Sequence, residues 1–342
     1  MPNPSNIQTI LVSSNKGGLG DAIRERVFLS SLRQAFPNAE ITYLTRKKNW
    51  HSNSMFDSLV RKPAMIHGKQ YKRPLIDKII IEKSLGRTLK ELLFNSCPVK
   101  TKYDLIIAME RGLFPPLCVK KIPHTWFVSY SMFWIFSDLK PISKKLNETH
   151  ILDKYYSIVE AASQKPAPEA DFSLPVSSED LNEAKLLLPD TKKKYIGQVP
   201  GAGDKSKSWA LEKHIELASK LYDEGYIPVF ILGPNETEWF DILQKEVPFA
   251  KFPLQETKQE SSVFLTAAIG ERLSAAVSND CGTTHILAST EIPLITLFGR
   301  TSAEKNIPFS KNAITLSASD FVKGSKNMND IPVDYVFNQL RN

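Results

Sequence analysis

The stretch NKGGLGDAIRERVFLSSL, from Asn15 to Leu32, joins an apolar run to a glycine-rich turn and a segment of mixed polarity. The run before it, Ile10-Leu11-Val12, predicts a buried strand over Thr9–Ser13. Apolar residues then recur at helical spacing, which predicts a helix from about Asp21 to Phe36. A turn and a second strand follow in PNAEITYLT. This order is the opening of a βαβ unit with a parallel sheet.

The glycine turn is compatible with more than one kind of site. The dinucleotide fingerprint G-x-G-x-x-G, started at Gly18, requires a third glycine where Ile23 stands, and the second strand ends near Arg46 rather than an acid for a ribose. No Gly-Lys-Ser/Thr closes the turn, so the P-loop pattern is absent too. Asp21 is placed either to cap the helix or to act as a general base, and both interpretations stay open at this point.

The rest of the chain continues the α/β pattern. In the first half, Tyr103–Met109 reads as a further buried strand, and residues 50–75 look like loops. The proline-rich stretch Ser163–Asp180 has no periodicity and predicts a linker. Gly225 is placed to end a helix at its C-cap. After the linker, the predicted strands are YIGQVPG, IPVFILG, LSAAVSND and IPLITLFG, and the predicted helices are WALEKHIELASKLYDEG, NETEWFDILQKEV and TTHILAST.

Two such halves predict an α/β chain of two Rossmann-like domains that face each other across a cleft. We expect a first domain over residues 1–165 and a second over residues 166–320. Residues 321–342 are expected to form a C-terminal helix that packs back on the first domain.

Charge is divided unevenly between the halves. Residues 1–165 contain 26 Lys and Arg against 13 Asp and Glu, a net charge of +13, whereas residues 166–342 contain 18 against 24, a net charge of −6. A basic half joined to an acidic half suggests that the first half meets an anionic partner. Lysines scattered over a solvated surface would give the same totals.

Composition indicates a soluble globular protein of the cytoplasm. The three cysteines share no metal-ligand spacing, so we expect neither a disulfide nor a structural zinc site. The first residues, MPNPSNIQT, lack the basic and apolar regions of a secretory signal, and no apolar stretch approaches the roughly 20 residues that span a bilayer.

Three strand-end loops of the second half carry chemistry. The first is VPGAGDKSKSW, in which Gly201, Ala202, Lys205 and Lys207 supply backbone amides and ammonium groups suited to a diphosphate. The second, LGPNETE, carries Glu236. The third is SNDCGTTHILA, with the candidate residues Asp280, Cys281, Gly282, Thr283 and His285. The carboxyl ends of strands are where open α/β sheets bind ligands, so the three loops together predict one site.

These stretches carry a family resemblance. GLGD after the first strand, PGA…SKSW, GPNE, NDCGTTHILA and PLITLFGRT resemble glycosyltransferase family 9, the ADP-heptose:lipopolysaccharide heptosyltransferases. The resemblance implies a GT-B fold and an inverting mechanism that uses no metal and no cofactor. It implies Asp21 as the general base, Lys207 at the donor phosphates, Glu236 at the nucleoside, and the loop from Asp280 to His285 around the diphosphate and sugar. Gly18 and Gly20 would then lie on the acceptor side.

This chain departs from the family pattern in two places. Cys281 replaces the usual threonine, and Gly203-Asp204-Lys205 replaces a stretch more like S-W-P. Contacts from backbone amides would survive both changes. No D-x-D triplet occurs, which agrees with stabilisation of the leaving group by Lys207 and helix amides rather than by a metal.

An aromatic segment, HTWFVSYSMFWIF over His124–Phe136, has Lys120, Lys121, Lys140, Lys144 and Lys145 around it. A buried strand or helix explains it. Aromatics beside lysines also describe a contact with anionic lipid, which would suit a lipid-linked acceptor. We therefore expect a cytoplasmic enzyme. If the aromatic segment contacts lipid, the enzyme would also bind peripherally to the cytoplasmic face of the inner membrane.

The sequence thus predicts transfer of heptose from ADP-heptose to a lipopolysaccharide core-type acceptor. The expected partners are a nucleotide sugar and an anionic lipid-linked saccharide, and no nucleic acid. Two alternatives stay open: a GT-B transferase with another nucleotide-sugar donor, and a non-catalytic protein that binds a sugar nucleotide.

Overall fold

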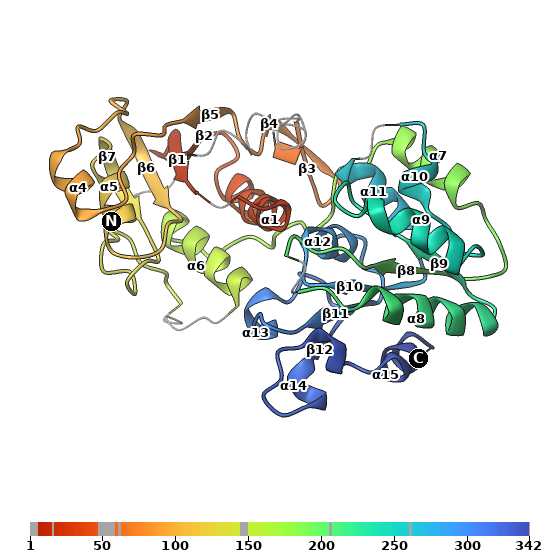
Figure 1. The fold of residues 1–342 in the computed structure, drawn as a ribbon. Helices are drawn as coiled ribbons and strands as arrows, with labels where there is room; N and C mark the ends of the chain where they lie inside the picture. The colour runs from red at the N-terminus through yellow and green to blue at the C-terminus, as the bar shows by residue number, and fades with distance from the viewer. Residues whose placement is uncertain are drawn as a thin grey trace. The chain divides into compact units, whose positions relative to one another are not determined.

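The computed structural model describes residues 6–15, 17–46, 59–60, 63–143, 150–204, 207–259 and 262–341. The chain forms two compact units, residues 1–171 and 172–342 (Figure 1). Their boundary falls inside the predicted linker, a few residues after the predicted domain boundary at residue 165. Within the described residues, none of the helices combines the length and apolarity needed to cross a bilayer.

The first unit is built on a parallel five-stranded sheet of order β5-β2-β1-β6-β7. Its central strand carries the buried apolar run that opened the sequence, with every residue from Ile10 to Ser13 buried. Parallel strands are covered on both faces, which is why they read as continuous apolar runs. The strands are β1 (Thr9–Ser13), β2 (Glu40–Thr45), β5 (Lys78–Ile81), β6 (Tyr103–Ala108) and β7 (His124–Val128).

Helices cover this sheet in pairs. Helix α1 packs against α6, with the Phe28 and Tyr155 rings 5.4 Å apart. Helix α4 packs against α5, and α5 reaches the buried cluster of Leu11, Ile106 and Phe127 through Val119. The helices are α1 (Leu19–Ala35), α4 (Leu89–Phe94), α5 (Phe114–Lys120) and α6 (Ile151–Ser163).

The prediction of loops over residues 50–75 is wrong for part of that range. An antiparallel hairpin forms from β3 (Pro63–Ile66) and β4 (Lys69–Pro74). Its two-residue turn, His67-Gly68, has φ of 47° and 71°, the left-handed pair that two-residue hairpins prefer. Strand β4 keeps most of its polar side chains in solvent, so it leaves no apolar run to detect. Residues 50–58, 61 and 62 lie outside the described residues.

The second unit holds another parallel five-stranded sheet, of order β12-β11-β10-β8-β9. All residues of β8, β10 and β11 are buried. The strands are β8 (Tyr195–Val199), β9 (Ile227–Phe230), β10 (Ala275–Asn279), β11 (Leu294–Phe298) and β12 (Ala313–Ser317). The four strands predicted for this half are confirmed, and β12 is an addition.

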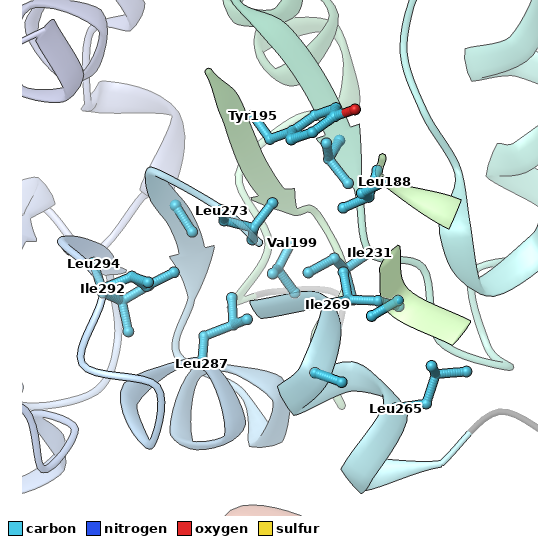
Figure 2. Packing of buried hydrophobic residues seen from close by; sticks show 14 of the residues in the cluster. Leu188, Tyr195, Val199, Ile231, Leu265, Ile269, Leu273, Leu287, Ile292 and Leu294 are labelled. Atoms are coloured by element: carbon cyan, nitrogen blue, oxygen red, sulfur yellow. The ribbon is translucent and has the colours of Figure 1, made fainter. Parts of the chain in front are cut away.

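Apolar clusters lie on both faces of this sheet. On one face, Leu188, Leu265 and Leu287 from three helical segments form one cluster with the strand residues Val199 and Leu294 (Figure 2). On the other face, Trp209 and residues of α8 and α15 pack on the alternate strand residues. The helices are α7 (Ser178–Leu187), α8 (Leu211–Asp223), α9 (Thr237–Glu246), α10 (Pro253–Glu256), α11 (Val263–Gly270), α12 (Gly282–Ala288), α13 (Ala303–Asn306), α14 (Ala318–Phe321) and α15 (Val333–Arg341), with a 3₁₀ turn at Met328–Asp330.

The second unit tests two predictions, the helix end at Gly225 and the C-terminal helix. Gly225 ends α8 as predicted, with φ of 86°, a left-handed conformation that glycine adopts without strain; it lies one residue after the C-cap, which is Glu224. The C-terminal segment is part of the second unit rather than a separate element. Its helix α15 packs against α8 and β10, with Val333 and Val336 buried in the cluster on that face.

Candidate active-site loops

The order of the second sheet determines where its loops meet. The chain passes from β8 to β9 on one side and then crosses back to place β10 beside β8. Connections therefore leave β8 and β10 in opposite directions, which opens a crevice at the carboxyl ends of this strand pair. The loop of Gly201 follows β8 and the loop of Asp280 follows β10, so two of the three predicted loops lie at this point.

Asn279 joins these two loops. Its fully buried side chain donates from Nδ2 to the Pro200 carbonyl at 2.7 Å and accepts at Oδ1 from the Trp209 amide at 3.1 Å. The last residue of β10 thus fixes both the start and the end of the segment that carries Lys207. Sequence reasoning did not single out Asn279, although its place at a strand end beside Asp280 was a usable signal.

Lys207 and Asp280 are brought together. Lys207 Nζ lies 3.8 Å from Asp280 Oδ2, and the side chains are 33% and 15% exposed. The same Asp280 oxygen accepts a hydrogen bond from Thr301 Oγ1 at 2.7 Å. Asp280 is thereby held in place, whereas the ion pair is longer than the 2.7–2.9 Å of a charge-assisted hydrogen bond. The Lys207 ammonium group is therefore only loosely engaged by its carboxylate partner.

Glu236 lies against two glycines that approach it closely. A Cβ added at Gly201 would lie 2.5 Å from Glu236 Cδ, and one added at Gly233 would lie 2.6 Å from Oε2. A larger residue at either position would push the Glu236 carboxyl aside, so the two glycines allow Glu236 to lie where it does. Partial burial raises the pKa of Glu236 above its usual value, and a hydrogen bond from the Gly233 backbone opposes that shift. The second predicted loop, which carries Glu236, is therefore in contact with the first.

The loop after β10 is supported from within. The Cys281 amide donates to Thr284 Oγ1 at 3.4 Å, and its Sγ lies 3.4 Å from the same oxygen and 3.7 Å from Ser278 Oγ. The thiol thus faces the base of α12. His285 is buried in α12. Gly282 and Thr283, like Ala202 in the first loop, are partly exposed.

One predicted donor-binding residue, Lys205, lies outside the described residues. The structure therefore brings Gly201, Lys207, Glu236 and Asp280 into one group of loops and leaves Lys205 undecided.

The glycine turn of the first unit starts its helix earlier than predicted. Helix α1 begins at Leu19, with Gly18 as its N-cap and Gly20 in its first turn. Asp21 is the third helical residue, so the interpretation of Asp21 as the N-cap is wrong. Glycine is a weaker helix-start signal than aspartate, which explains the two-residue error. Asp21 Oδ1 accepts from Arg24 Nη2 at 2.9 Å, and the Asp21 side chain is 30% exposed.

The first sheet also has a crevice-forming strand pair, β1 and β6, because β2 and β5 lie on one side of it and β7 on the other. Directly after β6 and Met109 comes Glu110, which is buried and accepts hydrogen bonds from Ser13 Oγ and Asn15 Nδ2. Burial raises the pKa of Glu110 to about 7. Sequence reasoning missed this residue.

The aromatic segment is partly core and partly surface. Phe127 and Trp134 are buried, whereas Met132, Phe133 and Ile135 are exposed. The lysines beside it hold the backbone: Lys120 Nζ donates to the Phe136 carbonyl at 2.7 Å, and Lys121 Nζ donates to the Leu92 carbonyl at 2.9 Å. Lys144 and Lys145 lie outside the described residues.

Two Rossmann-like units, the second with three loops gathered at its strand ends, define the class as a protein of the GT-B fold. Solved structures share this fold over nearly the whole chain. A glycosyl transferase family 9 structure from Veillonella parvula has a TM-score of 0.66 at 20% identity and covers 98% of this chain and 96% of its own. The ADP-heptose LPS heptosyltransferase II of Escherichia coli has a TM-score of 0.63 at 19% identity and covers 98% of both chains.

The chain belongs to glycosyltransferase family 9 (heptosyltransferase), whose model matches residues 99–330. That range contains the three loops of the second unit and does not contain Asp21. A lipopolysaccharide heptosyltransferase 2 of Salmonella typhimurium is 30% identical over 247 residues, covering 68% of this chain and 67% of the relative. A lipooligosaccharide heptosyltransferase 2 of Haemophilus influenzae is 24% identical over 334 residues, covering 90% and 89%. The chain is therefore a glycosyltransferase, and the interpretation as a non-catalytic binding protein falls away.

Proposed function

We propose that this enzyme transfers heptose from ADP-heptose to a lipopolysaccharide core-type acceptor, with inversion and without a metal. The observation that carries the proposal is the group formed by Gly201, Lys207, Glu236 and Asp280 at the strand ends of the second unit. The relatives named above act as lipopolysaccharide and lipooligosaccharide heptosyltransferases, which supports this choice of donor and acceptor.

In this proposal the second unit holds the donor. The loosely paired ammonium group of Lys207 would neutralise charge on the leaving diphosphate, and backbone amides of Gly201, Ala202, Gly282 and Thr283 would bind its oxygens. The carboxylate of Glu236 would accept hydrogen bonds from the nucleoside. No part of this assignment requires the thiol of Cys281, which faces the base of α12.

The first unit would supply the base. Asp21 is exposed enough to meet an acceptor, and Arg24 orients its carboxylate through Oδ1. It would take the proton from an acceptor hydroxyl as that oxygen attacks the anomeric carbon from the face opposite the diphosphate. One displacement with one base inverts the anomeric configuration.

The donor is tested by thermal shift and by transfer. ADP-heptose at about a hundred times its Kd should add about 2.7 kcal/mol to the free energy of unfolding of the unit that binds it, because it binds only the folded state. We expect ADP-heptose to raise the Tm and UDP- and GDP-sugars to leave it unchanged. A larger shift with a UDP- or GDP-sugar would assign a different donor, and transfer from ADP-heptose with retention would overturn the proposed mechanism.

We also propose that the first unit rests on an anionic membrane surface. Its net charge complements anionic lipid, and two segments near the end of α5 expose apolar side chains: the first is α4, with Leu93 and Phe94, and the second is the turn Met132–Ile135. Lys120 and Lys121 tie these segments to the same helix end. In the second segment, Met132, Phe133 and Trp134 have φ of 50°, 55° and 65°. Three successive non-glycine residues in the left-handed region are strained, and the turn keeps Phe133 and Ile135 76% and 72% exposed.

Replacing Phe133 and Ile135 with serine should reduce binding to vesicles that contain anionic lipid by several fold, with transfer to a soluble acceptor unchanged. The matched control is Leu186→Ser, because Leu186 is 77% exposed but belongs to the acidic second unit. Vesicle sedimentation at low salt measures the effect, and added salt should weaken binding by the wild type. Equal losses in the control, or no binding by the wild type at low salt, would contradict this surface.

A further inference from the structure

Glu110 occupies the strand pair at which the first sheet opens. It follows β6 directly after Met109, whose amide donates to the Ser13 carbonyl at 2.9 Å and extends the pairing of β6 with β1. Glu110 Oε1 accepts from Ser13 Oγ at 2.5 Å and from Asn15 Nδ2 at 3.1 Å. A single carboxyl oxygen thus ties the end of β6 to the end of β1 and to the turn that precedes α1.

The same turn is tied to two further elements. Asn15 Oδ1 accepts from the Arg46 amide at 2.9 Å, which connects the turn to the end of β2. Ser14 Oγ donates to Glu25 of α1, and Glu25 also accepts from Tyr43 OH of β2. Glu25 lies one helical turn after Asp21. Glu110 is therefore part of a network of hydrogen bonds that connects the ends of β6, β1 and β2 with the start of α1.

This arrangement is unfavourable for stability alone. Glu110 is 8% exposed, and its Oε2 is a buried atom with no hydrogen-bond partner among the described residues. Burying a carboxyl group with an unpartnered oxygen costs folding free energy. The burial raises the pKa of Glu110, and the nearby negative charge of Glu25 adds to that shift. Costs of this kind are concentrated at functional sites.

We propose that Glu110 is a positioning residue that holds Ser13 and Asn15 at the end of β1 and, through the neighbouring contact of Ser14 with Glu25, the helix that carries Asp21. This inference rests on the proposed role of Asp21 as the base. It assigns to Glu110 no contact with substrate, because its carboxyl is buried.

The test compares three variants under saturating ADP-heptose and acceptor. Glu110→Ala removes the acceptor oxygen, and we expect kcat per folded enzyme to fall by about 10–100-fold with the donor KM unchanged. Glu110→Gln keeps an acceptor oxygen for Ser13 and Asn15, and kcat should stay within about threefold of the wild type. Asp104→Ala is the matched control, because Asp104 ties the opposite end of the same strand pair through Thr9. It should lower Tm and leave kcat unchanged.

Asn15→Ala provides a second test that keeps the β1–β6 pairing intact, should Glu110→Ala fail to fold. It removes the link to the Arg46 amide, and kcat should fall with the donor KM unchanged. Normal kcat in folded Glu110→Ala or Asn15→Ala, or an equal loss in Asp104→Ala, would overturn the proposal.

The outcome separates this inference from the proposed function. In an Asp21→Asn background, Glu110→Ala should cause no further loss, because both changes act on one proton transfer. If Asp21→Asn keeps normal turnover, the assignment of the base fails. If Asp21→Asn abolishes turnover and Glu110→Ala does not reduce it, the base stands and the positioning role alone is overturned.

Discussion

Asp21→Asn should reduce sugar transfer by about 10²–10⁴-fold, the usual loss when a general base is removed. The amide keeps the size of the side chain and can still accept a hydrogen bond from Arg24, so the local geometry should change little. Helix α1 is capped at Gly18, without a side-chain cap, so no capping bond is lost. The variant loses only the interaction of a negative charge with the helix dipole, about 0.3–1 kcal/mol.

Asp153→Asn is the matched control for this experiment. Asp153 is the third residue of α6, as Asp21 is of α1, and it is likewise an acid in the first helical turn. Both variants should show a similar small change in Tm, and only Asp21→Asn should lose turnover. Affinity for the donor, measured by thermal shift, should be unchanged because the proposed donor groups belong to the second unit. Transfer by Asp21→Asn at more than about a tenth of the normal rate would contradict the assignment.

The sequence predicted the frame of the fold because the signals involved are local. Buried parallel strands such as Thr9–Ser13 and Leu294–Phe298 consist of continuous apolar runs, and Gly225 marks a helix end through its own backbone conformation. The hairpin of β3 and β4 was missed because β4 is polar and lies outside the main sheet. Its one usable signal was the turn His67-Gly68, a short pair ending in glycine.

Prediction of the candidate site reached the loops but not the contacts between them. Strand-end loops can be located from apolar runs and glycines, and the structure brings the loops of Gly201, Glu236 and Asp280 near one another. The roles of Asn279 and Glu110 depend on partners 79 and 95 residues away in the chain. Contacts of this kind can be predicted only when the strand order is known. The order β5-β2-β1-β6-β7 cannot be deduced from any single segment of the sequence.

The thiol of Cys281 shows the same limit. The sequence shows that Cys281 replaces the usual threonine, but it does not show which way the thiol points. The structure turns the thiol toward Ser278 and Thr284. Donor choice in this family member should therefore depend on Glu236 and the loop backbones rather than on the substitution at position 281.

Metal independence is checked with a chelator. If Lys207 neutralises the leaving group, transfer should persist when divalent cations are removed. Complete loss of transfer in chelator, restored by magnesium, would assign that task to a metal ion.

Lys207→Ala should lower kcat by about 10²–10³-fold, the range observed when one group that stabilises developing charge is removed. The lysine already lies near a fixed carboxylate, Asp280, at 3.8 Å, and Thr301 holds that carboxylate in place. Removing the ammonium group therefore removes a positive charge at the loop crevice and leaves an uncompensated negative charge in its place. Both effects oppose binding of a diphosphate, so the donor KM should rise as well.

Two further variants separate charge from position. Lys245→Ala removes one positive charge from an exposed site at the end of α9 in the same unit, and it should leave kcat and KM unchanged. Lys207→Arg keeps the charge on a longer, planar group and should recover part of the loss. Because the pair with Asp280 is long and partly open to solvent, it contributes little to stability, and Lys207→Ala should fold with a nearly unchanged Tm. Normal kinetics for Lys207→Ala at subsaturating donor would show that another cation carries the diphosphate, and the undescribed Lys205 would be the next residue to replace.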